Sequence, residues 1–279
     1  MESMIKKQKI IIANKYEIHE KIGNGSFGSI YQGINQRTYE KVAIKVEPVE
    51  YNLKLLKNES ILYQYLKDVK GIPNVKWFGK DQINYYMVIP LLGDSLNILK
   101  KKFGAFSLHS IIQIGLNILQ LIETIHEKGL IHRDIKPDNF LFGIDSNQLY
   151  LIDFGFCKSY FVEKEHIPFK NIHKIIGSPN FVSIHTHDHI TQSRRDDLES
   201  FGYILYYLYY GDFEWSNVSL TNDLFYEKNN KEMKKMKMMI NEKNDLPDFL
   251  KKIFIYVRQM YFEEKPDYLF IRNLMVENL

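Results

Sequence analysis

The sequence predicts an α+β fold in two lobes, a small β-rich lobe at about residues 16–90 and a larger helical lobe at about residues 91–279. Before residue 90, short runs of β-branched and aromatic residues alternate with glycine-containing or polar turns, which is typical of strands. Beyond residue 92, apolar residues recur at intervals of three and four, as on one face of a helix. Residues 1–15 are predicted to be a short N-terminal extension.

The bulk composition excludes several classes of protein. The 279 residues are 45% hydrophobic and 25% charged, which is ordinary for a globular chain with one large domain or two lobes. The net charge of +3 is too small to indicate a nucleic-acid partner. The single cysteine, Cys157, excludes an internal disulfide framework and fits a reducing compartment. We interpret Cys157 as a small buried apolar residue and not as a catalytic thiol.

No segment of the sequence predicts attachment to a membrane. The best apolar run, residues 201–211, is shorter than the about 20 residues that a spanning helix needs. Residues 1–8 carry charges, and no signal-peptide core follows them. We therefore expect an intracellular protein, cytoplasmic or nuclear, or one of a host cell or virion if its source is viral.

Strands and one helix are predicted for the first lobe. The helix is expected at residues 53–68, because Leu56, Glu59 and Tyr63 fall on one face of it. The polar stretch 81–84 predicts a turn. The strands are expected at residues 16–22, 29–34, 41–47, 75–80 and 85–89.

Two long helices are predicted for the second lobe. Ser107 is placed to cap the first, whose apolar stripe runs from Leu108 to Ile125, and Gly129 is suited to end it. The second, at residues 197–210, is apolar on nearly every face. We therefore expect it to be buried all round, at the centre of the lobe.

Two polar segments of this lobe have alternative interpretations. The histidines His185, His187 and His189 resemble a metal cluster, but alternate residues do not share a helix face and no second ligand pair completes the set. Residues 228–243 are rich in lysine and methionine. A basic nucleic-acid patch is one interpretation of this stretch. We favour a helix with its methionines inward and its lysines in solvent.

Three glycines, Gly23, Gly25 and Gly28, lie between two predicted strands. A dinucleotide-binding fingerprint stands between a strand and a helix, so this placement argues against one. Glycines in a hairpin let backbone amides approach phosphates closely, although an ordinary glycine-rich hairpin has the same pattern. Lys45, in a following strand, is suited to hold phosphates, and Glu59 on the predicted helix is suited to orient it.

A dense set of polar residues follows at 132–139, and Asp153 comes directly after the apolar run 149–152. Asp134 is placed to accept or orient the proton of a substrate hydroxyl, and Lys136 to neutralise a transferring phosphoryl group. Asn139 and Asp153 offer the hard oxygen ligands that Mg²⁺ prefers. This order of residues, downstream of a glycine hairpin, predicts phosphoryl transfer.

These segments resemble protein kinases, and the casein kinase I family in particular. The resemblance covers residues 16–279, which it identifies as one bilobal protein-kinase domain with a β-rich N-lobe and a helical C-lobe. It rests on H-R-D-I-K-P-D-N-F-L at 132–141, on residues 177–187, on Q-S-R-R-D-D-L-E-S at 192–200 and on E-K-P-D-Y at 264–268.

The resemblance implies a monomeric serine/threonine kinase that uses ATP and Mg²⁺ and modifies Ser or Thr at acidic sites of protein substrates. Lys136 and Ser178 match the serine/threonine pattern, and Asp197 matches the residue that braces the catalytic loop. The catalytic residues that it implies are Asp134, Lys136, Asn139 and Asp153, of which Asn139 and Asp153 would bind the metal.

The resemblance also implies a nucleotide site. In it, Ile89 matches the gatekeeper, and Pro90 and Leu92 match the hinge that meets adenine. The implied site consists of Ile22, Gly23, Asn24, Gly25, Ser26, Phe27, Gly28, Ile30, Ala43, Lys45, Glu59, Ile89, Pro90, Leu92, Leu141 and Ile152.

Two departures from the family concern substrate choice. Asn180 stands where the family has an arginine at its anion pocket, and a lysine cluster of the family is replaced around residues 223–226. These changes predict a weak preference for substrates that already carry a phosphate.

Two other classes of protein are compatible with the same fold. One is a pseudokinase that binds partners, against which the intact Lys45, Asp134, Asn139 and Asp153 argue. The other is a small-molecule phosphotransferase, which the serine/threonine-kinase pattern around Gly177 disfavours.

Overall fold

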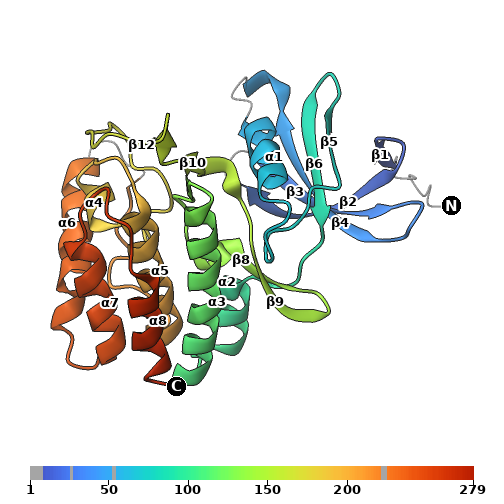
Figure 1. Cartoon of the computed structure of the whole chain (residues 1–279). Coiled ribbons are helices and arrows are strands. Elements are labelled where there is room, and N and C mark those ends of the chain that lie inside the picture. The colour runs from blue at the N-terminus through green and yellow to red at the C-terminus, as the bar shows by residue number, and fades with distance from the viewer. Residues whose placement is uncertain (1–8, 26–27, 52–54, 221–224) are drawn as a thin grey trace. The chain divides into compact units, whose positions relative to one another are not determined.

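The computed structural model describes residues 9–25, 28–51, 55–220 and 225–279. Contacts divide the chain into two compact units. The first takes in Met1–Gly93 and Phe142–Gly155, and the second takes in Asp94–Leu141 and Phe156–Leu279. Figure 1 labels the helices and strands of both.

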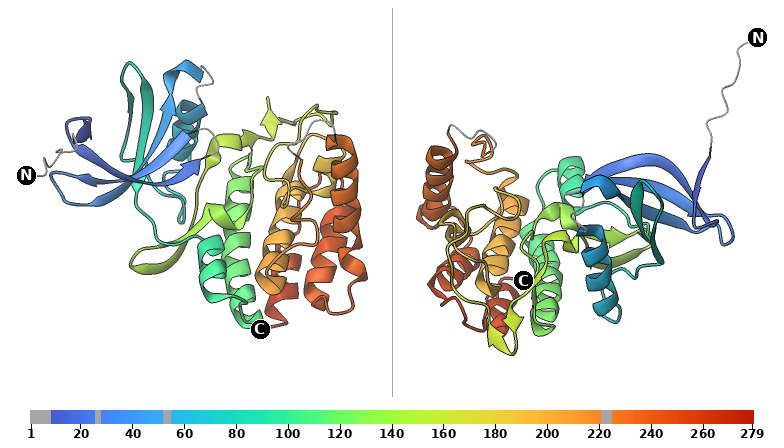
Figure 2. Two further views of the ribbon diagram at one scale, coloured as in Figure 1. Left: turned by 180° about the vertical axis from the view of Figure 1, so that it is seen from behind. Right: turned by 90° about the horizontal axis from the view of Figure 1, so that it is seen from above.

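Within the described residues, the first unit is built on a six-stranded antiparallel sheet in the order β1-β2-β3-β4-β6-β5. A 3₁₀ turn, Val49–Tyr51, and the helix α1 (Leu55–Tyr65) follow β4, and α1 contacts β6 (Figure 2). The strands are β1 (Ile10–Ile12), β2 (Tyr16–Gly25), β3 (Gly28–Asn35), β4 (Lys41–Pro48), β5 (Trp77–Lys80) and β6 (Asn84–Pro90).

The alternation of side chains along these strands forms the core of the sheet. Val42 and Ile44 on β4, and Tyr86 and Val88 on β6, point to one face and are buried there with Ile12 of β1. The predicted strands and the predicted helix are confirmed to within a few residues at each end. The sequence analysis did not predict β1, which pairs with the start of β2.

The segment Phe142–Gly155 was assigned to the second lobe in the sequence analysis, whereas its contacts group it with the first unit. It contains most of the hairpin formed by β8 (Phe140–Gly143) and β9 (Ser146–Leu151). The N–H of Gly93 donates to the Phe142 carbonyl at 2.8 Å, and the N–H of Leu151 donates to the Gly71 carbonyl at 2.9 Å. These backbone bonds attach the hairpin to Gly71, which precedes β5 in the sequence, and to Gly93, which follows β6.

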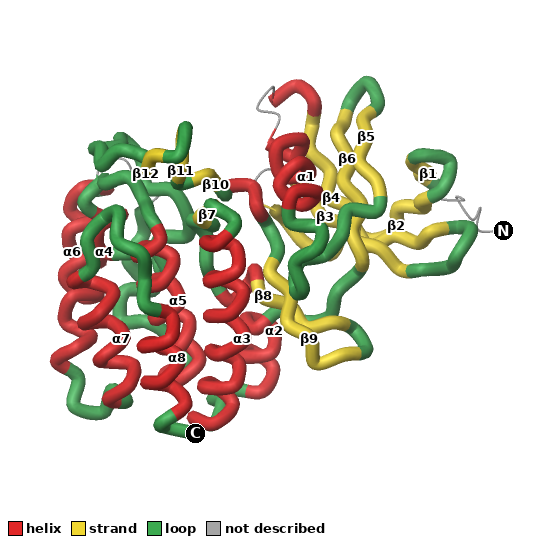
Figure 3. Tube along the Cα trace, viewed as in Figure 1, coloured by secondary structure: helices red, strands yellow, loops and turns green. Residues whose placement is uncertain are grey.

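Helices dominate the second unit, as Figure 3 shows by colour. The sequence and the structure agree on the α+β class: an antiparallel sheet is followed by a mainly helical region. The helices are α2 (Leu96–Phe103), α3 (Leu108–Glu127), α4 (Ile184–His187), α5 (Arg194–Tyr210), α6 (Tyr226–Met238), α7 (Asp248–Gln259) and α8 (Tyr268–Val276). The shorter elements are β7 (Leu130–Ile131), β10 (Lys158–Ser159), β11 (Phe161–Val162), β12 (Glu165–His166) and 3₁₀ turns at Pro137–Asn139, Phe154–Phe156 and Met239–Glu242.

Both long helices confirm their predictions. The Ser107 hydroxyl accepts the N–H of Ser110 at the start of α3, and Gly129 follows the end of that helix with a φ of 77°. Helix α5 contacts α3 and α7 and is buried along almost its whole length. Leu198, Phe201 and other side chains on all its faces therefore belong to the core of this unit.

Helix α3 has the length and composition of a membrane-spanning helix, with 20 residues and a mean hydropathy of 1.3. The sequence analysis did not single it out. In the structure α3 contacts α5 and α8, and 44% of its apolar window is buried. A core helix of a globular protein passes the same test, so this one helix is weak evidence for a membrane.

The prediction for α6 is wrong at individual positions. Methionines were expected to face inward and lysines to face solvent, but Lys237 is fully buried and Met239 is exposed. Buried positions Met233, Lys237 and Ile240 are spaced by four and three residues, which is the spacing of one helix face. The helical spacing therefore determines which positions of this segment are buried, and Lys237 occupies one of these buried positions.

Candidate active site

The predicted phosphate loop is the β2–β3 hairpin of the first unit. Gly25 and Gly28 are paired at its end, and Gly23 pairs with Ile30. A Cβ on Gly28 would lie 2.1 Å from the carbonyl oxygen of Val46, so any side chain there would force the strands apart. At Gly23 a Cβ would meet nothing within 4 Å, so the backbone at this position is open to a ligand.

The same hairpin carries further residues of the implied nucleotide site. Ile22 is 47% exposed, so its side chain is accessible to a ligand. Asn24 is exposed and Ile30 is half-buried. Ser26 and Phe27, the tip of the hairpin, lie outside the described residues.

Lys45 on β4 is held between two carboxylates within the first unit. Its Nζ lies 2.8 Å from Glu59 on α1 and 2.8 Å from Asp153 after β9. Burial opposes the charge of Lys45, but the two carboxylates outweigh it and raise the pKa of Lys45 above its usual value. Burial also raises the pKa of Glu59, which the Lys45 charge opposes. The sequence prediction of Lys45, Glu59 and Asp153 therefore corresponds to one connected group in the structure.

Tyr63 supports Asp153, a role that its predicted place on the helix face of Glu59 did not by itself indicate. The N–H of Asp153 donates to the Tyr63 hydroxyl at 3.1 Å, and the Phe154 ring packs edge-on against the Tyr63 ring with centroids 5.0 Å apart. Asp153 has a φ of 65°, a left-handed conformation that a non-glycine residue adopts at a cost. Tyr63 falls one helical turn after Glu59, and that spacing was the available signal.

The predicted adenine-contacting residues form partly open apolar surfaces. Ala43 of β4 pairs with Ile89 of β6, and Val42 pairs with Pro90. Leu141 belongs to the second unit and the others to the first. The following residues are all half-buried: Ala43, Ile89, Pro90, Leu92, Leu141 and Ile152.

The second unit brings Asp134, Lys136 and Asn139 together. One carboxylate oxygen of Asp134 accepts the N–H of Ser178 at 2.9 Å and its hydroxyl at 2.8 Å. The other oxygen lies 2.7 Å from Lys136 Nζ, which also donates to the Ser178 hydroxyl at 2.9 Å. The Asn139 side-chain amide donates to the Asp134 carbonyl at 2.8 Å. A carboxylate, an ammonium group and a hydroxyl are thus in mutual contact.

Gly177 allows Ser178 to approach Asp134. Its φ is 101°, in the left-handed region that favours glycine. A Cβ at this position would lie 2.4 Å from the carbonyl oxygen of Arg133, so a side chain would push the Ser178 loop away from the catalytic segment.

Asp197 braces the segment that carries Asp134. From α5 its carboxylate accepts the N–H groups of His132 at 2.7 Å and Arg133 at 2.8 Å. Burial alone would raise the pKa of Asp197, but the hydrogen bond from His126 and the other donors lower it. His126 also contacts the Tyr268 hydroxyl at 2.7 Å. The sequence analysis identified Asp197 but missed His126 and Tyr268, which are distant in sequence.

Asn139 and Asp153 have the chemistry of Mg²⁺ ligands. Asn139 uses its amide nitrogen to hold Asp134, and no described residue donates to its side-chain oxygen. The carboxylate of Asp153 supplies a second hard oxygen. Mg²⁺ keeps several waters and needs few protein ligands, so the Asn139 oxygen in the second unit and the Asp153 carboxylate in the first are each of the kind that it binds.

Arg133 directly precedes Asp134, and Cys157 follows Asp153 by four residues. We predict no role in the chemistry for either residue. The Arg133 Nε donates to the Phe156 carbonyl at 2.6 Å. Burial raises the pKa of the Cys157 thiol to about 12, so the thiol stays protonated and weakly nucleophilic.

The alternating histidines do not form a metal cluster in the structure. His187 Nδ1 contacts Asn230 Oδ1 at 2.5 Å, and His189 faces Glu227 at 3.7 Å. Within the parts of the chain that the structure describes, no group of three His, Cys, Asp or Glu side chains could hold a metal ion.

Two comparisons with known proteins show what the chain is similar to. The model of the protein kinase domain family matches residues 16–266. The chain is 38% identical over 276 residues to casein kinase I homolog 2 of Schizosaccharomyces pombe. That match covers 96% of this chain and 63% of the yeast protein, so the chain spans less than two thirds of the relative's length.

Proposed function

Because this chain belongs to the protein kinase family, we propose that it transfers the γ-phosphate of ATP to serine and threonine hydroxyls of proteins, with Mg²⁺ as its cofactor. The observation that carries the proposal is the carboxylate of Asp134. It accepts a serine hydroxyl at 2.8 Å and lies 2.7 Å from the Lys136 ammonium group. A substrate hydroxyl in the place of the Ser178 hydroxyl would meet a proton acceptor and a cation together.

The Lys45 group supplies the phosphate-binding half of the proposal. A lysine with its charge fixed by two carboxylates can hold the α- and β-phosphates without reorganising when the nucleotide binds. Bound through Asn139 and Asp153, Mg²⁺ would neutralise charge on the phosphates.

The reaction that we propose for Asp134 and Lys136 is an in-line displacement at the γ-phosphorus of ATP. The substrate oxygen forms a bond to the γ-phosphorus while the bond from that phosphorus to the β–γ bridging oxygen breaks, and ADP leaves. Asp134 orients the hydroxyl and accepts its proton, and Lys136 stabilises charge on the transferring group. Since positioning and electrostatics do this work, loss of one group costs orders of magnitude in rate.

The finer assignment is a casein kinase I-type enzyme acting as an intracellular monomer on acidic sites of proteins. The identity of 38% to the yeast homolog and the segment at 192–200 support it. A cytoplasmic or nuclear address is part of the same proposal, as is the absence of a nucleic-acid partner or membrane.

A pseudokinase is the second candidate. The ion pairs of Lys45 and the contacts of Asp134 favour the enzyme, because a chain that only binds partners has no need of them. Turnover discriminates the two candidates.

The test is transfer of labelled γ-phosphate to casein and to a degenerate serine/threonine peptide library with Mg²⁺ present. We expect phosphoserine and phosphothreonine from the wild-type protein, and a loss of about 10³-fold or more with Asp134→Asn. Asp138→Asn is the matched control, because Asp138 lies in the same loop, is exposed and accepts a hydrogen bond from the Asn97 side chain, not from Lys136 or Ser178. Equal activity of wild type and Asp134→Asn would refute the proposal.

A further inference from the structure

One lysine of α6 is fully buried. Lys237 has 0% exposure, whereas Lys235 on the same helix is exposed. Burial of an ammonium group is costly unless it is hydrogen-bonded, and a methionine of similar length would fill the same space without that cost. The partners of this amine therefore indicate what it does.

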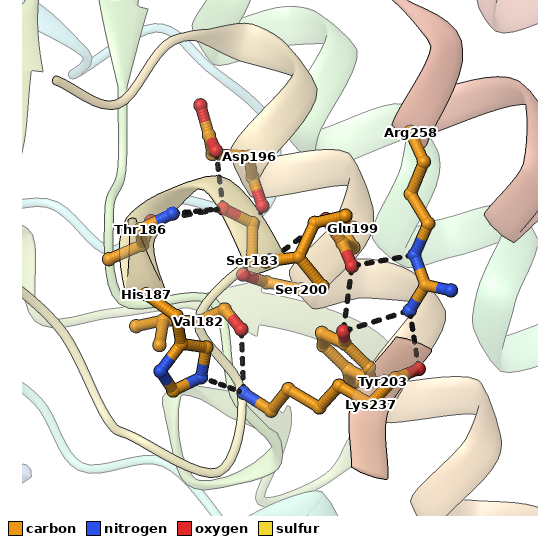
Figure 4. A network of polar contacts seen from close by, with 11 residues as sticks. Val182, Ser183, Thr186, His187, Asp196, Glu199, Ser200, Tyr203, Lys237 and Arg258 are labelled. Atoms are coloured by element: carbon orange, nitrogen blue, oxygen red, sulfur yellow. Dashed lines mark hydrogen bonds and ion pairs between the residues drawn. The ribbon is translucent and has the colours of Figure 1, made fainter. Parts of the chain in front are cut away.

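The Lys237 amine binds the backbone of the loop at residues 178–182, whose first residue, Ser178, contacts Asp134. It donates to the Val182 carbonyl at 2.7 Å and lies 2.9 Å from His187 Nε2, as Figure 4 shows, and it also donates to the Pro179 carbonyl at 2.7 Å. Burial lowers the pKa of Lys237 well below its usual value, but three acceptors surround the amine, as many as an ammonium group has donors. Two of these acceptors are backbone atoms, so the amine fixes main-chain positions.

The surroundings favour this arrangement. Burial, aided by the Lys237 charge, lowers the pKa of His187 to about 3, so the ring is neutral and Nε2 can accept. His187 Nδ1 contacts Asn230 Oδ1 and therefore carries the ring proton. The Lys237 Nζ also lies 4.8 Å from the Tyr203 ring centroid and 5.6 Å from that of Trp215, where the ring faces attract a cation.

A second group of contacts holds α6 in place. The Arg258 guanidinium donates to the Lys237 carbonyl at 2.8 Å and to Glu199 at 2.9 Å (Figure 4). Glu199 also accepts the Tyr203 hydroxyl at 2.7 Å and the N–H of Ile184 at 3.2 Å. The helix that presents Lys237 is thus tied to α5 and to the start of α4.

The loop at residues 178–182 is consequently fixed at both ends. Ser178 is bound to Asp134, and the far end is bound to Lys237. Between them, the indole N–H of Trp215 donates to the Asn180 carbonyl at 3.2 Å. A protein whose hydroxyl reaches Asp134 must pass this loop with the residues next to its target.

We propose that Lys237 is a positioning residue for the acceptor protein, which sets the loop at residues 178–182 in the conformation that receives the residues flanking the target hydroxyl. The inference rests on the proposed kinase function and deepens it. It assigns to a buried lysine of α6 an effect on acceptor binding that leaves nucleotide binding unchanged.

The test compares Lys237→Met with the control Lys235→Met on α6. The measurements are KM for an acceptor peptide, KM for ATP and the slow hydrolysis of ATP without peptide. We expect Lys237→Met to raise the peptide KM about tenfold, as loss of charged hydrogen bonds predicts. The ATP KM and the rate of ATP hydrolysis should stay within about twofold of wild type, because a water molecule that accepts the phosphate does not have to be positioned by the loop at residues 178–182.

Trp215→Phe gives an independent reading, because it removes the bond to the Asn180 carbonyl and keeps an aromatic ring. It should raise the peptide KM about threefold, and it decides the question if Lys237→Met does not fold. An unchanged peptide KM, or an equal loss in every measurement, would overturn the inference in an active enzyme. A wild-type protein that transfers no phosphate would overturn the proposed function and this inference with it.

Discussion

At the scale of the residue, Asn180 presents a neutral amide where the casein kinase I family has an arginine for a phosphate. Two lysines of α6 already have other partners. Lys237 is used by the loop carbonyls, and Lys234 pairs with Asp188 at 2.5 Å. Residues 221–224 lie outside the described residues.

We predict a weak preference for acceptor peptides with phosphoserine three residues before the target. A charged hydrogen bond is worth about 1.5–3 kcal/mol, so Asn180→Arg should raise the preference about ten- to a hundredfold. The measurement is kcat/KM on matched peptides with serine or phosphoserine, and Asn180→Gln is the neutral control. A wild-type ratio well above tenfold would contradict the prediction and point to exposed lysines such as Lys170 or Lys174.

Single residues were predictable where chemistry fixes their order along the chain. Lys45, Asp134 and Asp153 stand at the spacing of the protein-kinase motifs that they resemble, and the structure gives each of them a charged partner. Lys237 could not be predicted, because its partners come from a distant loop and its polarity argues for solvent. His126 was missed for the same reason: its contact with Asp197 spans 71 positions.

At the scale of the element, residues 156–182 lead from the turn after Asp153 towards α4 and carry three hydroxyl groups, those of Ser159, Tyr160 and Ser178. Tyr160 is buried and donates to the His126 carbonyl at 2.6 Å, and Ser178 is bound to Asp134. Ser159 donates to the Phe161 carbonyl at 2.7 Å. The Arg133 guanidinium, which could otherwise demand a phosphate, donates to the backbone of Phe156.

We therefore predict activity without phosphorylation of this segment. Protein made in bacteria and treated with phosphatase should keep its initial rate to within about twofold, because the Arg133 Nε already donates to the Phe156 carbonyl and the hydroxyls of this segment have partners of their own. The rate on a peptide acceptor is measured before and after treatment, with mass spectrometry to establish that no phosphate remains. Activity that is lost on treatment and restored by an upstream kinase would contradict this.

Elements were predictable in proportion to their periodicity. Ser107 and Gly129 bound α3 as capping rules predict, and the uniform apolarity of α5 predicts its burial. The strand β1 has only three residues, too few for a pattern to show. For α6 the positions of the methionines predicted the wrong buried face, because Lys237 occupies a buried position that an apolar residue normally fills.

At the scale of the whole molecule, the two units carry different parts of the proposed machinery. The first holds the glycine hairpin, Lys45 and Asp153, which we expect to bind nucleotide and metal. The second holds Asp134, Lys136 and the loop that Lys237 fixes, which we expect to bind and orient the acceptor. The α+β class followed from composition and periodicity, whereas the grouping of Phe142–Gly155 with the first unit required the backbone bonds of the hairpin.

The most direct test of this division of labour is the dissociation constant of ATP, measured by calorimetry with and without Mg²⁺. We predict that wild type and Asp134→Asn bind Mg·ATP with Kd values within about twofold of each other, although only wild type turns over. Asp153→Ala should bind about tenfold or more weakly and lose the effect of Mg²⁺, because its carboxylate is a proposed ligand. The account would be contradicted if Asp134→Asn weakened ATP binding as much as Asp153→Ala, or if Mg²⁺ had no effect on the wild-type Kd.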